Sequence, residues 1–406
     1  MTKKSDAPAI RFKGFSDAWE QRKAKELFVS TADKGYPELP VLSATQDRGM
    51  IRRDENSINI FHDKKNEAGY KRVLPGQFVI HLRSFQGGFA HSAIEGITSP
   101  AYTVFGFSEP EKHDSEYWKY VFTSKSFIRR LETVTYGIRD GRSISYDEFL
   151  TLGFVYPSKA EQTAIARYLD KLSDLITLHQ RKFEKLTNVK KSMLEKMFPQ
   201  NSSSYPEIRF KGFTDPWEQR KFSDVVATRR GLTYKPSDIR KNGVRVLRSS
   251  NIAEDSFALS DEDVFVVREA VNIDCARAND ILITAANGSS RLVGKHTIIS
   301  GIPEESAVHG GFMLLGTTKE PHFVNASMGS SWYRRFIELF VAGGNGAIGN
   351  LNKNDLDNQE IAIPSEEEQE KIGSFFRQLD HLITLHQREL EKLQNIKKSM
   401  LEKMFV

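Results

Sequence analysis

The stretch LITLHQRKFEKLTNVKKSMLEKMF at residues 175–198 returns almost unchanged as LITLHQRELEKLQNIKKSMLEKMF at residues 382–405. Twenty of the 24 positions are identical, at an offset of 207 residues. A second pair lies upstream of each: IRFKGFSDAWEQRK at 10–23 and IRFKGFTDPWEQRK at 208–221 share 12 of 14 positions, at an offset of 198. Because an internal repeat governs the architecture of a chain, the order here is block, intervening segment and block, repeated once.

The longer block has the spacing of a coiled-coil helix. Its seam positions recur at alternating steps of four and three residues, which keeps one stripe of an α-helix against a partner. Each helix of about 40 residues would be about 60 Å long, and it cannot bury its stripe alone. We therefore expect the two copies to pair as an antiparallel coiled coil related by a pseudo-twofold axis. The seam residues are Leu172, Ile176, His179, Phe183 and Leu186, and their equivalents Leu379, Ile383, His386, Leu390 and Leu393.

The two seam histidines have two readings. A polar residue in a seam sets the register of the helices at some cost in stability, and this is the reading that we favour. The alternative is a metal site or a pH switch.

The segments between the blocks differ from each other in sequence and mix strands with helices. We expect strands at 73–82 and 279–286 and amphipathic helices at 114–133 and 327–341. The fold class is therefore α+β, with two α/β domains separated by the two long helices. The predicted boundaries are 1–157 for the first domain, 158–199 for the first helix, 200–364 for the second domain and 365–406 for the second helix.

The composition excludes several classes of protein. A single cysteine, Cys275, rules out an intramolecular disulfide framework and a Cys-rich zinc module, and it is typical of a reducing cytosol. The first residues lack the apolar stretch of a signal peptide, and no apolar run is long enough to cross a membrane. We expect a cytoplasmic protein. The net charge of +5 favours polyanions only weakly.

No sequence motif points to catalysis. Gly344-x-Gly346-x-x-Gly349 has the letters of a dinucleotide fingerprint, but it follows an expected helix where the fingerprint follows a strand. We find no phosphate-binding loop, no nucleophile elbow and no metal-spaced cysteines or histidines. We therefore expect no catalytic residue, cofactor or metal in this chain.

Polar loops in both intervening segments have the residue types that bind DNA. Arginine pairs with two acceptors of guanine, asparagine and glutamine pair with adenine, and serine and lysine hold phosphates. Polar residues are common in surface loops of any protein, so the argument rests on the set and on its recurrence in both segments. The candidates are Arg83, Ser84, Gln86, Arg139 and Arg142 in the first segment, and Arg229, Arg230, Arg248, Asn251, Asn287, Ser290, Arg291 and Lys295 in the second.

With both repeats in place, the chain resembles the specificity subunit of type I restriction–modification systems. The resemblance is carried by the two RFKGF-x-D-x-W-E-Q-R-K openings, the two P-S-x-x-E-Q-x-x-I helix starts and the two KKSMLEKMF helix ends, and it covers essentially the whole chain. It implies two target-recognition domains that each read one half of a bipartite, asymmetric DNA site. It also implies helices that space the half-sites and dock two modification subunits.

The same resemblance implies partners that carry the chemistry. Adenine methylation with S-adenosylmethionine would belong to the modification subunits, and the restriction subunits would use ATP and magnesium. Three alternatives stay open: a specificity module of a type IIB-like modification enzyme, a coiled-coil scaffold that presents two ligand-binding domains without DNA, and an enzyme whose motif is not recognised in the sequence. The DNA sequence and the gap between half-sites are not predictable from unplaced loops.

Overall fold

A computed structural model describes residues 8–45, 48–56, 64–81, 88–132, 145–200, 203–253, 256–341 and 349–405. The chain forms two compact units. Unit 1 is made of the described residues up to Gln180 together with those from Arg388 onward, and unit 2 runs from Arg181 to Gln387. Each unit therefore holds one intervening segment and parts of both long helices.

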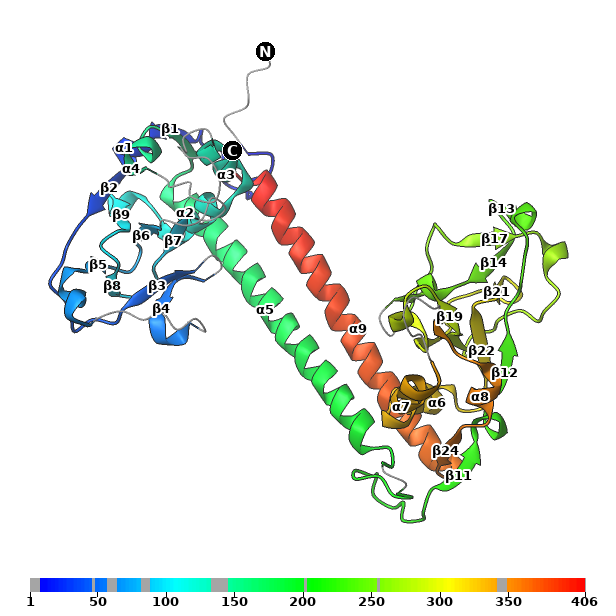
Figure 1. Cartoon of the computed structure of the whole chain (residues 1–406). Helices are drawn as coiled ribbons and strands as arrows, with labels where there is room; N and C mark the ends of the chain where they lie inside the picture. Colours follow the sequence, from blue (N-terminus) through cyan, green and yellow to red (C-terminus); the bar gives the residue numbers. More distant parts are fainter. Residues whose placement is uncertain are drawn as a thin grey trace. The chain divides into compact units, whose positions relative to one another are not determined.

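Unit 1 is built on a four-stranded antiparallel sheet with the strand order β2-β9-β6-β7 (Figure 1). The strands are β1 (Glu20–Lys23), β2 (Phe28–Thr31), β3 (Leu42–Thr45), β4 (Gly49–Arg52), β5 (Lys71–Val73), β6 (Phe78–Ile80), β7 (Phe89–His91), β8 (Gly96–Thr98), β9 (Thr103–Phe107) and β10 (Gly153–Tyr156). The helices are α1 (Ala24–Leu27), α2 (Ser115–Thr123), α3 (Lys125–Glu132), α4 (Tyr146–Phe149) and the first part of α5 (Lys159–Lys196).

Unit 2 repeats this sheet with the order β12-β22-β18-β20 and adds a second four-stranded sheet, β13-β17-β14-β21. Its strands are β11 (Glu218–Lys221), β12 (Ala227–Arg230), β13 (Ile239–Arg240), β14 (Val244–Leu247), β15 (Ile252–Ala253), β16 (Ser256–Phe257), β17 (Val264–Val266), β18 (Ile281–Thr284), β19 (Ala286–Asn287), β20 (His296–Ile298), β21 (Ala307–His309), β22 (Met313–Thr317), β23 (Gly349–Asn350) and β24 (Glu360–Ile363). Its helices are α6 (Pro321–Met328), α7 (Ser331–Phe340), α8 (Lys353–Asp357) and the first part of α9 (Glu366–Lys403). The predicted α+β class is confirmed.

The expected helix over 114–133 is two helices, α2 and α3, which Ser124 separates. The buried Ser124 hydroxyl donates to the Val121 carbonyl at 2.7 Å and accepts from the Phe127 N–H at 3.2 Å, so it ends one helix and begins the next. Ser330 lies between α6 and α7 and donates to the Ser327 carbonyl at 2.7 Å, but its side chain accepts no hydrogen bond from the first turn of α7. Small serines at these positions break the helical pattern in both units, so the expectation of one continuous helix at 114–133 is wrong.

The repeated openings and helix starts are explained by a buried ion pair. Arg11 contacts Glu161 through its Nε at 2.8 Å and through its terminal nitrogen at 2.6 Å, and Arg209 contacts Glu368 in the same way at 2.8 and 2.7 Å. Both glutamates are fully buried. The frame is therefore conserved between the halves because each buried carboxylate requires its arginine.

Each long helix begins in one unit and ends in the core of the other. In unit 1, Met404 and Phe405 at the end of α9 join a cluster of aromatic rings, and the Ile10 N–H donates to the Lys403 carbonyl at 3.2 Å. In unit 2, Met197 and Phe198 after α5 are buried likewise, and the Ile208 N–H donates to the Lys196 carbonyl at 2.9 Å. The repeated MLEKMF ends are thus core residues.

The helices pair antiparallel within each unit. Lys397 donates to Ser173 at 2.8 Å in unit 1, and Lys190 contacts Asp380 at 2.8 Å in unit 2. These two pairs are equivalent under the 207-residue offset, and their residue numbers add to the same total, as an antiparallel register requires. Every predicted seam residue is buried or half-buried, whereas Leu175, Leu178, Leu382 and Leu385 are 41–46% exposed.

Candidate nucleic-acid interface

One pair of the polar loops predicted to bind DNA connects equivalent strands in the two units. The loop between β18 and β20 in unit 2 corresponds to the loop between β6 and β7 in unit 1, because the strand orders match. The candidates in unit 1 are Arg83, Ser84, Gln86, Arg139 and Arg142, and all five lie outside the described residues. The geometry below therefore concerns unit 2.

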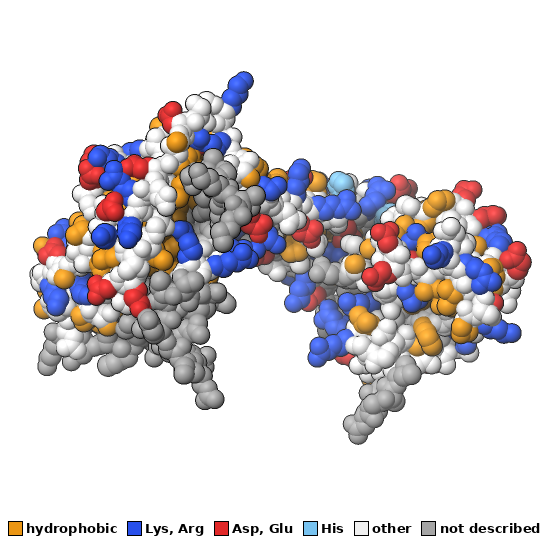
Figure 2. Space-filling view, turned by 90° about the horizontal axis from the view of Figure 1, so that it is seen from above, with side chains coloured by type: hydrophobic (Ala, Val, Ile, Leu, Met, Phe, Trp, Pro, Cys, Tyr) orange, Lys and Arg blue, Asp and Glu red, His pale blue; other side chains and the backbone are white. Residues whose placement is uncertain are grey.

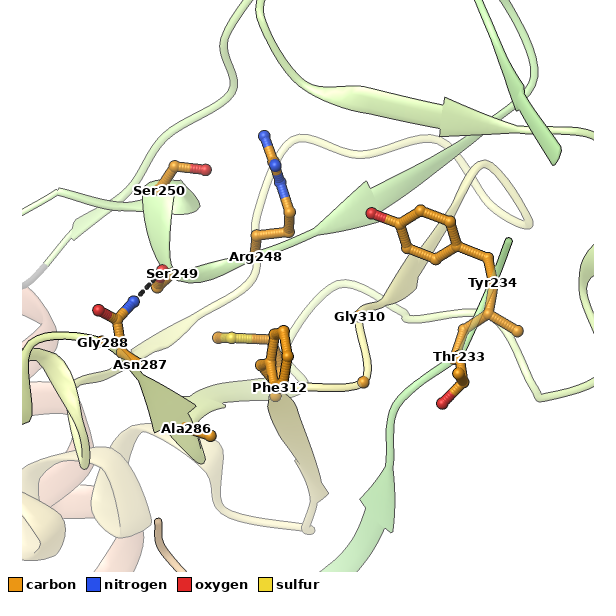
Figure 3. Close-up of a pocket in the computed structure, with 13 residues that line it drawn as sticks. Thr233, Tyr234, Arg248, Ser249, Ser250, Ala286, Asn287, Gly288, Gly310 and Phe312 are labelled. Atoms are coloured by element: carbon orange, nitrogen blue, oxygen red, sulfur yellow. Dashed lines mark hydrogen bonds between the residues drawn. The ribbon is translucent and has the colours of Figure 1, made fainter. Parts of the chain in front are cut away.

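A cavity of about 770 Å³ opens in unit 2 where four segments meet (Figure 3). We call it the Arg248 cavity. The segments are the residues after β12, the turn after β14, strand β19 with Gly288, and the turn between β21 and β22. The residues that line it are Leu232, Thr233, Tyr234, Arg248, Ser249, Ser250, Ala286, Asn287, Gly288, Gly310, Gly311, Phe312 and Met313.

Two glycines let these segments come together. A Cβ on Gly231 would lie 1.9 Å from the Gly310 carbonyl oxygen, so no other residue fits at this crossing. The Gly310 N–H donates to the Leu247 carbonyl at 2.8 Å, which ties the β21–β22 turn to the end of β14. The wall of the cavity is thus fixed by backbone contacts.

Of the predicted arginines that the structure describes, Arg248 alone lines the cavity. Its side chain is half-buried, and its Nε is buried without a hydrogen-bond partner among the described residues. Figure 3 shows Arg248 between Tyr234 on one side and Ser249 with Asn287 on the other, with Phe312 near its base. An unpaired buried donor costs about 1–3 kcal/mol, and no carboxylate in the described part of the chain pairs with this guanidinium.

Asn287 lines the same cavity, where its side chain holds the surrounding loops together. Its Nδ2 donates to the Ser249 hydroxyl at 2.9 Å, and its Oδ1 accepts from the Ser289 N–H at 2.9 Å. Both ends of the amide are therefore engaged in shaping the loop. Ser290 and Arg291 follow on the exposed turn, and Lys295 is half-buried at the start of the next strand.

The remaining candidates lie apart from the cavity lining. Arg229 on β12 pairs with Asp280 at 3.3 Å and with Asp274 at 3.5 Å, so its charge is already partly compensated. Arg230, next to it, is exposed.

Asn251 corrects the sequence prediction. It is fully buried, its Oδ1 accepts from the Arg248 N–H at 2.8 Å, and its Nδ2 donates to the Ala258 carbonyl and the Asp263 carboxylate at 3.0 and 2.9 Å. No part of this side chain is available to DNA. The prediction of a DNA contact is wrong for this residue, whose role is to hold the turn that carries Arg248.

Two aromatic residues of the cavity were not predicted. Phe312 is 72% exposed on the β21–β22 turn, and Tyr234 lines the opposite side. The Phe312 carbonyl accepts from the Ala285 and Ala286 N–H groups at 2.9 and 3.0 Å, which fixes the backbone of the turn. Sequence reasoning assigns phenylalanine to the core, and the only available signal was the pair of glycines before it.

A buried histidine lies behind the cavity wall. His309 on β21 is 1% exposed, and its Nε2 lies 3.2 Å from the Arg229 carbonyl. Burial lowers the pKa of His309 to about 4, with the nearby Arg229 adding to the decrease. His309 is therefore neutral at pH 7 and serves the fold.

Neither unit has a surface of a single charge sign on the face drawn in Figure 2, where basic and acidic side chains are interspersed. Within the described ranges, no three histidine, cysteine, aspartate or glutamate side chains gather in a way that could hold a metal ion. No helix in that part of the chain has the length and hydropathy to cross a membrane.

A second surface occurs twice, once in each unit. An open groove of about 510 Å³ lies along the part of α5 in unit 2, and one of about 580 Å³ lies along the part of α9 in unit 1. The lining residues are equivalent at every position under the 207-residue offset, and six of the seven are identical. They are Arg181, Glu184, Lys185, Asn188, Val189, Ser192 and Met193, and in turn Arg388, Glu391, Lys392, Asn395, Ile396, Ser399 and Met400. We call these the repeated grooves.

Comparison with known proteins finds a matching family model and several similar proteins. Residues 214–395 match the family model described as type I restriction modification DNA specificity domain. The type I restriction enzyme MjaVIII specificity subunit of Methanocaldococcus jannaschii is 22% identical over 259 residues, which span 60% of this chain and 59% of that protein. The chain thus covers less than two thirds of the length of this relative.

Two further similarities extend over nearly the whole chain. A protein described as the type I restriction enzyme MjaX specificity subunit, from the same organism, is 22% identical over 414 residues, covering 94% of this chain and 92% of that protein. The solved structure of the type I restriction–modification S subunit from M. genitalium superposes with a TM-score of 0.62 at 14% identity, covering 98% of this chain and 99% of that one. The similarity to the M. genitalium structure shows a shared fold.

Proposed function

Because residues 214–395 form a type I restriction modification DNA specificity domain, in a chain with the fold of a type I specificity subunit, we propose that this protein selects the DNA target of a type I restriction–modification complex. Each unit reads one half of a bipartite, asymmetric site. The two half-sites differ because the two reading segments differ in sequence.

The observation that carries the proposal is that the two units share their framework of ion pairs and strands but differ in their loops. The buried pairs Arg11–Glu161 and Arg209–Glu368 and the sheet orders are repeated, whereas the loops at the ends of the sheets differ. A protein that bound one ligand twice would keep the loops and the frame alike. Because the framework is repeated and the loops are not, the two units are two recognition domains of the same architecture with different DNA targets.

The repeated grooves support a partner that binds twice. Two surfaces with the same seven positions accept two copies of one protein, and the proposed occupants are two modification subunits. Restriction subunits join this assembly to complete the nuclease. The proposed location of the complex is the cytoplasm.

Catalysis is assigned to the partners. In the proposal this chain contributes no catalytic residue: S-adenosylmethionine binds the modification subunits, which methylate adenine, and ATP and magnesium bind the restriction subunits. The role of this chain is to hold DNA so that the target adenines meet the modification subunits.

The test is single-base mapping of adenine methylation in cells that contain the modification subunit with and without this chain. The expected result is a split motif with a fixed gap that disappears when this chain alone is deleted. A matched control restores the chain from a plasmid and returns the motif. A methylation pattern that is the same with and without the chain contradicts the proposal.

A further inference from the structure

The Arg248 cavity has a composition that selects among DNA contacts. Contacts to phosphates position a protein on the duplex and carry no sequence information directly, whereas contacts to base edges do. Arg248 lies half-buried in a concave site between Tyr234 and the engaged Ser249–Asn287 pair. An aromatic flank suits the face or edge of a base better than a hydrated phosphate.

Arg248 differs from the other buried or half-buried arginines of unit 2. Arg209 and Arg245 are each paired with a buried carboxylate, Glu368 and Asp263 respectively. Arg248 forms no ion pair with any residue that the structure describes, and its Nε has no acceptor there. Its guanidinium is thus the part of the cavity left to be satisfied by a ligand with acceptor groups.

The mounting of Arg248 is rigid. Its backbone N–H donates to the Oδ1 of the buried Asn251 at 2.8 Å, which holds the backbone of the turn that carries it. The backbone of Phe312 is held by two hydrogen bonds to its carbonyl. Because the backbones of Arg248 and Phe312 are ordered before DNA binds, binding costs less conformational entropy.

From these observations we infer that Arg248 reads a guanine in the half-site bound by unit 2, with Phe312 packing against the neighbouring base. Guanine is the base that presents two acceptors, O6 and N7, on its major-groove edge, and the guanidinium fork matches both. The inference rests on the proposed function, and it adds the residue and the base that it selects.

The experiment compares binding selections on randomised duplex DNA with the assembled complex of this chain and its modification subunits. The variants are Arg248→Lys, which keeps the charge and removes the fork, and Phe312→Ser, whose exposed position should leave the fold intact. Arg240→Lys is the matched control, because Arg240 is an exposed arginine of the same unit that bonds only to the nearby Ser237 and Ile239 carbonyls. Thermal unfolding of each variant checks the fold.

The expected result is that Arg248→Lys lowers the preference for guanine at one position of one half-site by about tenfold or more. Phe312→Ser weakens the preference at an adjacent position, and Arg240→Lys changes neither. Retention of every preference by Arg248→Lys, or an equal loss at all positions of both half-sites, overturns the inference while the split motif of the wild type stands. A wild-type complex without any sequence preference overturns the proposed function and this inference with it.

Discussion

At the scale of single residues, the contrast between Arg248 and Asn251 shows what decides a DNA contact. Both were predicted from residue type, and they are three positions apart. Arg248 lines the cavity with an unpaired Nε, whereas Asn251 is fully buried with its amide used in the turn. Residue type and loop position are legible in a sequence, but burial depends on which strands pair behind the loop.

Phe312 marks the opposite failure. An aromatic residue after two glycines reads as a core residue at the start of a strand, yet it is 72% exposed. It lies on a turn whose place is set by the long-range approach of Gly231 to Gly310. No local pattern carries that information, so the apolar part of the candidate site was missed.

His309 gives a prediction for pH. Burial lowers its pKa to about 4 in the folded chain, whereas an unfolded histidine titrates near 6.5. Stability is therefore complete above pH 6.5 and falls as the pH decreases from about 6.5 to about 4, because only the unfolded state then takes up the proton.

By this linkage, the change from pH 7 to pH 5 costs unit 2 about 2 kcal/mol through His309. The non-titrating variant His309→Gln should lose that part of the pH dependence. The measurement is hydrogen exchange of the amides of β18 and β22 at both pH values. Identical pH dependence in the wild type and the variant would contradict the assignment.

At the scale of elements, the two long helices were the most predictable part of the chain. The steps of four and three residues identified a seam whose members are all buried or half-buried, including the polar His179 and His386. The pattern succeeds because a coiled-coil stripe is a local property of the helix. The break at Ser124 was missed because its serine caps two short helices that share one apolar face.

A matched pair of leucines tests the seam. Leu172 is 6% exposed and Leu175 is 43% exposed on the same helix of unit 1. Leu172→Ala should lower the free energy of unfolding of unit 1 by about 2–5 kcal/mol, because it leaves a cavity. Leu175→Ala should change it by less than about 0.5 kcal/mol.

The measurement is denaturant unfolding, monitored by hydrogen exchange of the amides of β6 and β9 in unit 1. The equivalent change Leu379→Ala, at 7% exposure, should have the same effect on unit 2 and little on unit 1. Equal effects of Leu172→Ala and Leu175→Ala would mean that the stripe is assigned to the wrong face.

At the scale of the whole molecule, the repeats divide the chain into four segments, whereas the structure groups its residues into two units that share both helices. The repeats are defined by position along the chain, whereas the compact units are defined by contacts between residues that can be far apart in sequence. The ends of the helices, Met197–Phe198 and Met404–Phe405, lie in the two cores. The unit that each end completes was not predicted, because it depends on contacts across the chain.

The repeated grooves predict the stoichiometry of the assembly. Asn188→Arg places a large charged side chain in the groove of unit 2, and Asn395→Arg does the same in unit 1. Each single variant should retain one modification subunit in place of two, and the double variant should retain none. Native mass spectrometry with purified modification subunits measures the number.

Both asparagines are exposed, so the changes should leave the fold intact. Asp174→Arg, at an exposed position of α5 outside either groove, is the control and should retain two subunits. Two bound subunits on the double variant would remove the grooves from the proposed contact.

The sharing of helix ends has a consequence for synthesis on the ribosome. Unit 2 is a continuous stretch, so it has all its residues once Gln387 has left the exit tunnel. Unit 1 contains Phe28 and Phe105 but also Met404 and Phe405, so its core stays open until residue 405 has been added. Contacts of such long sequence separation form slowly, and exposed aromatic surface is prone to aggregate meanwhile. The half that is made first is therefore the half that folds last, and it is the part of the nascent chain with most need of a chaperone.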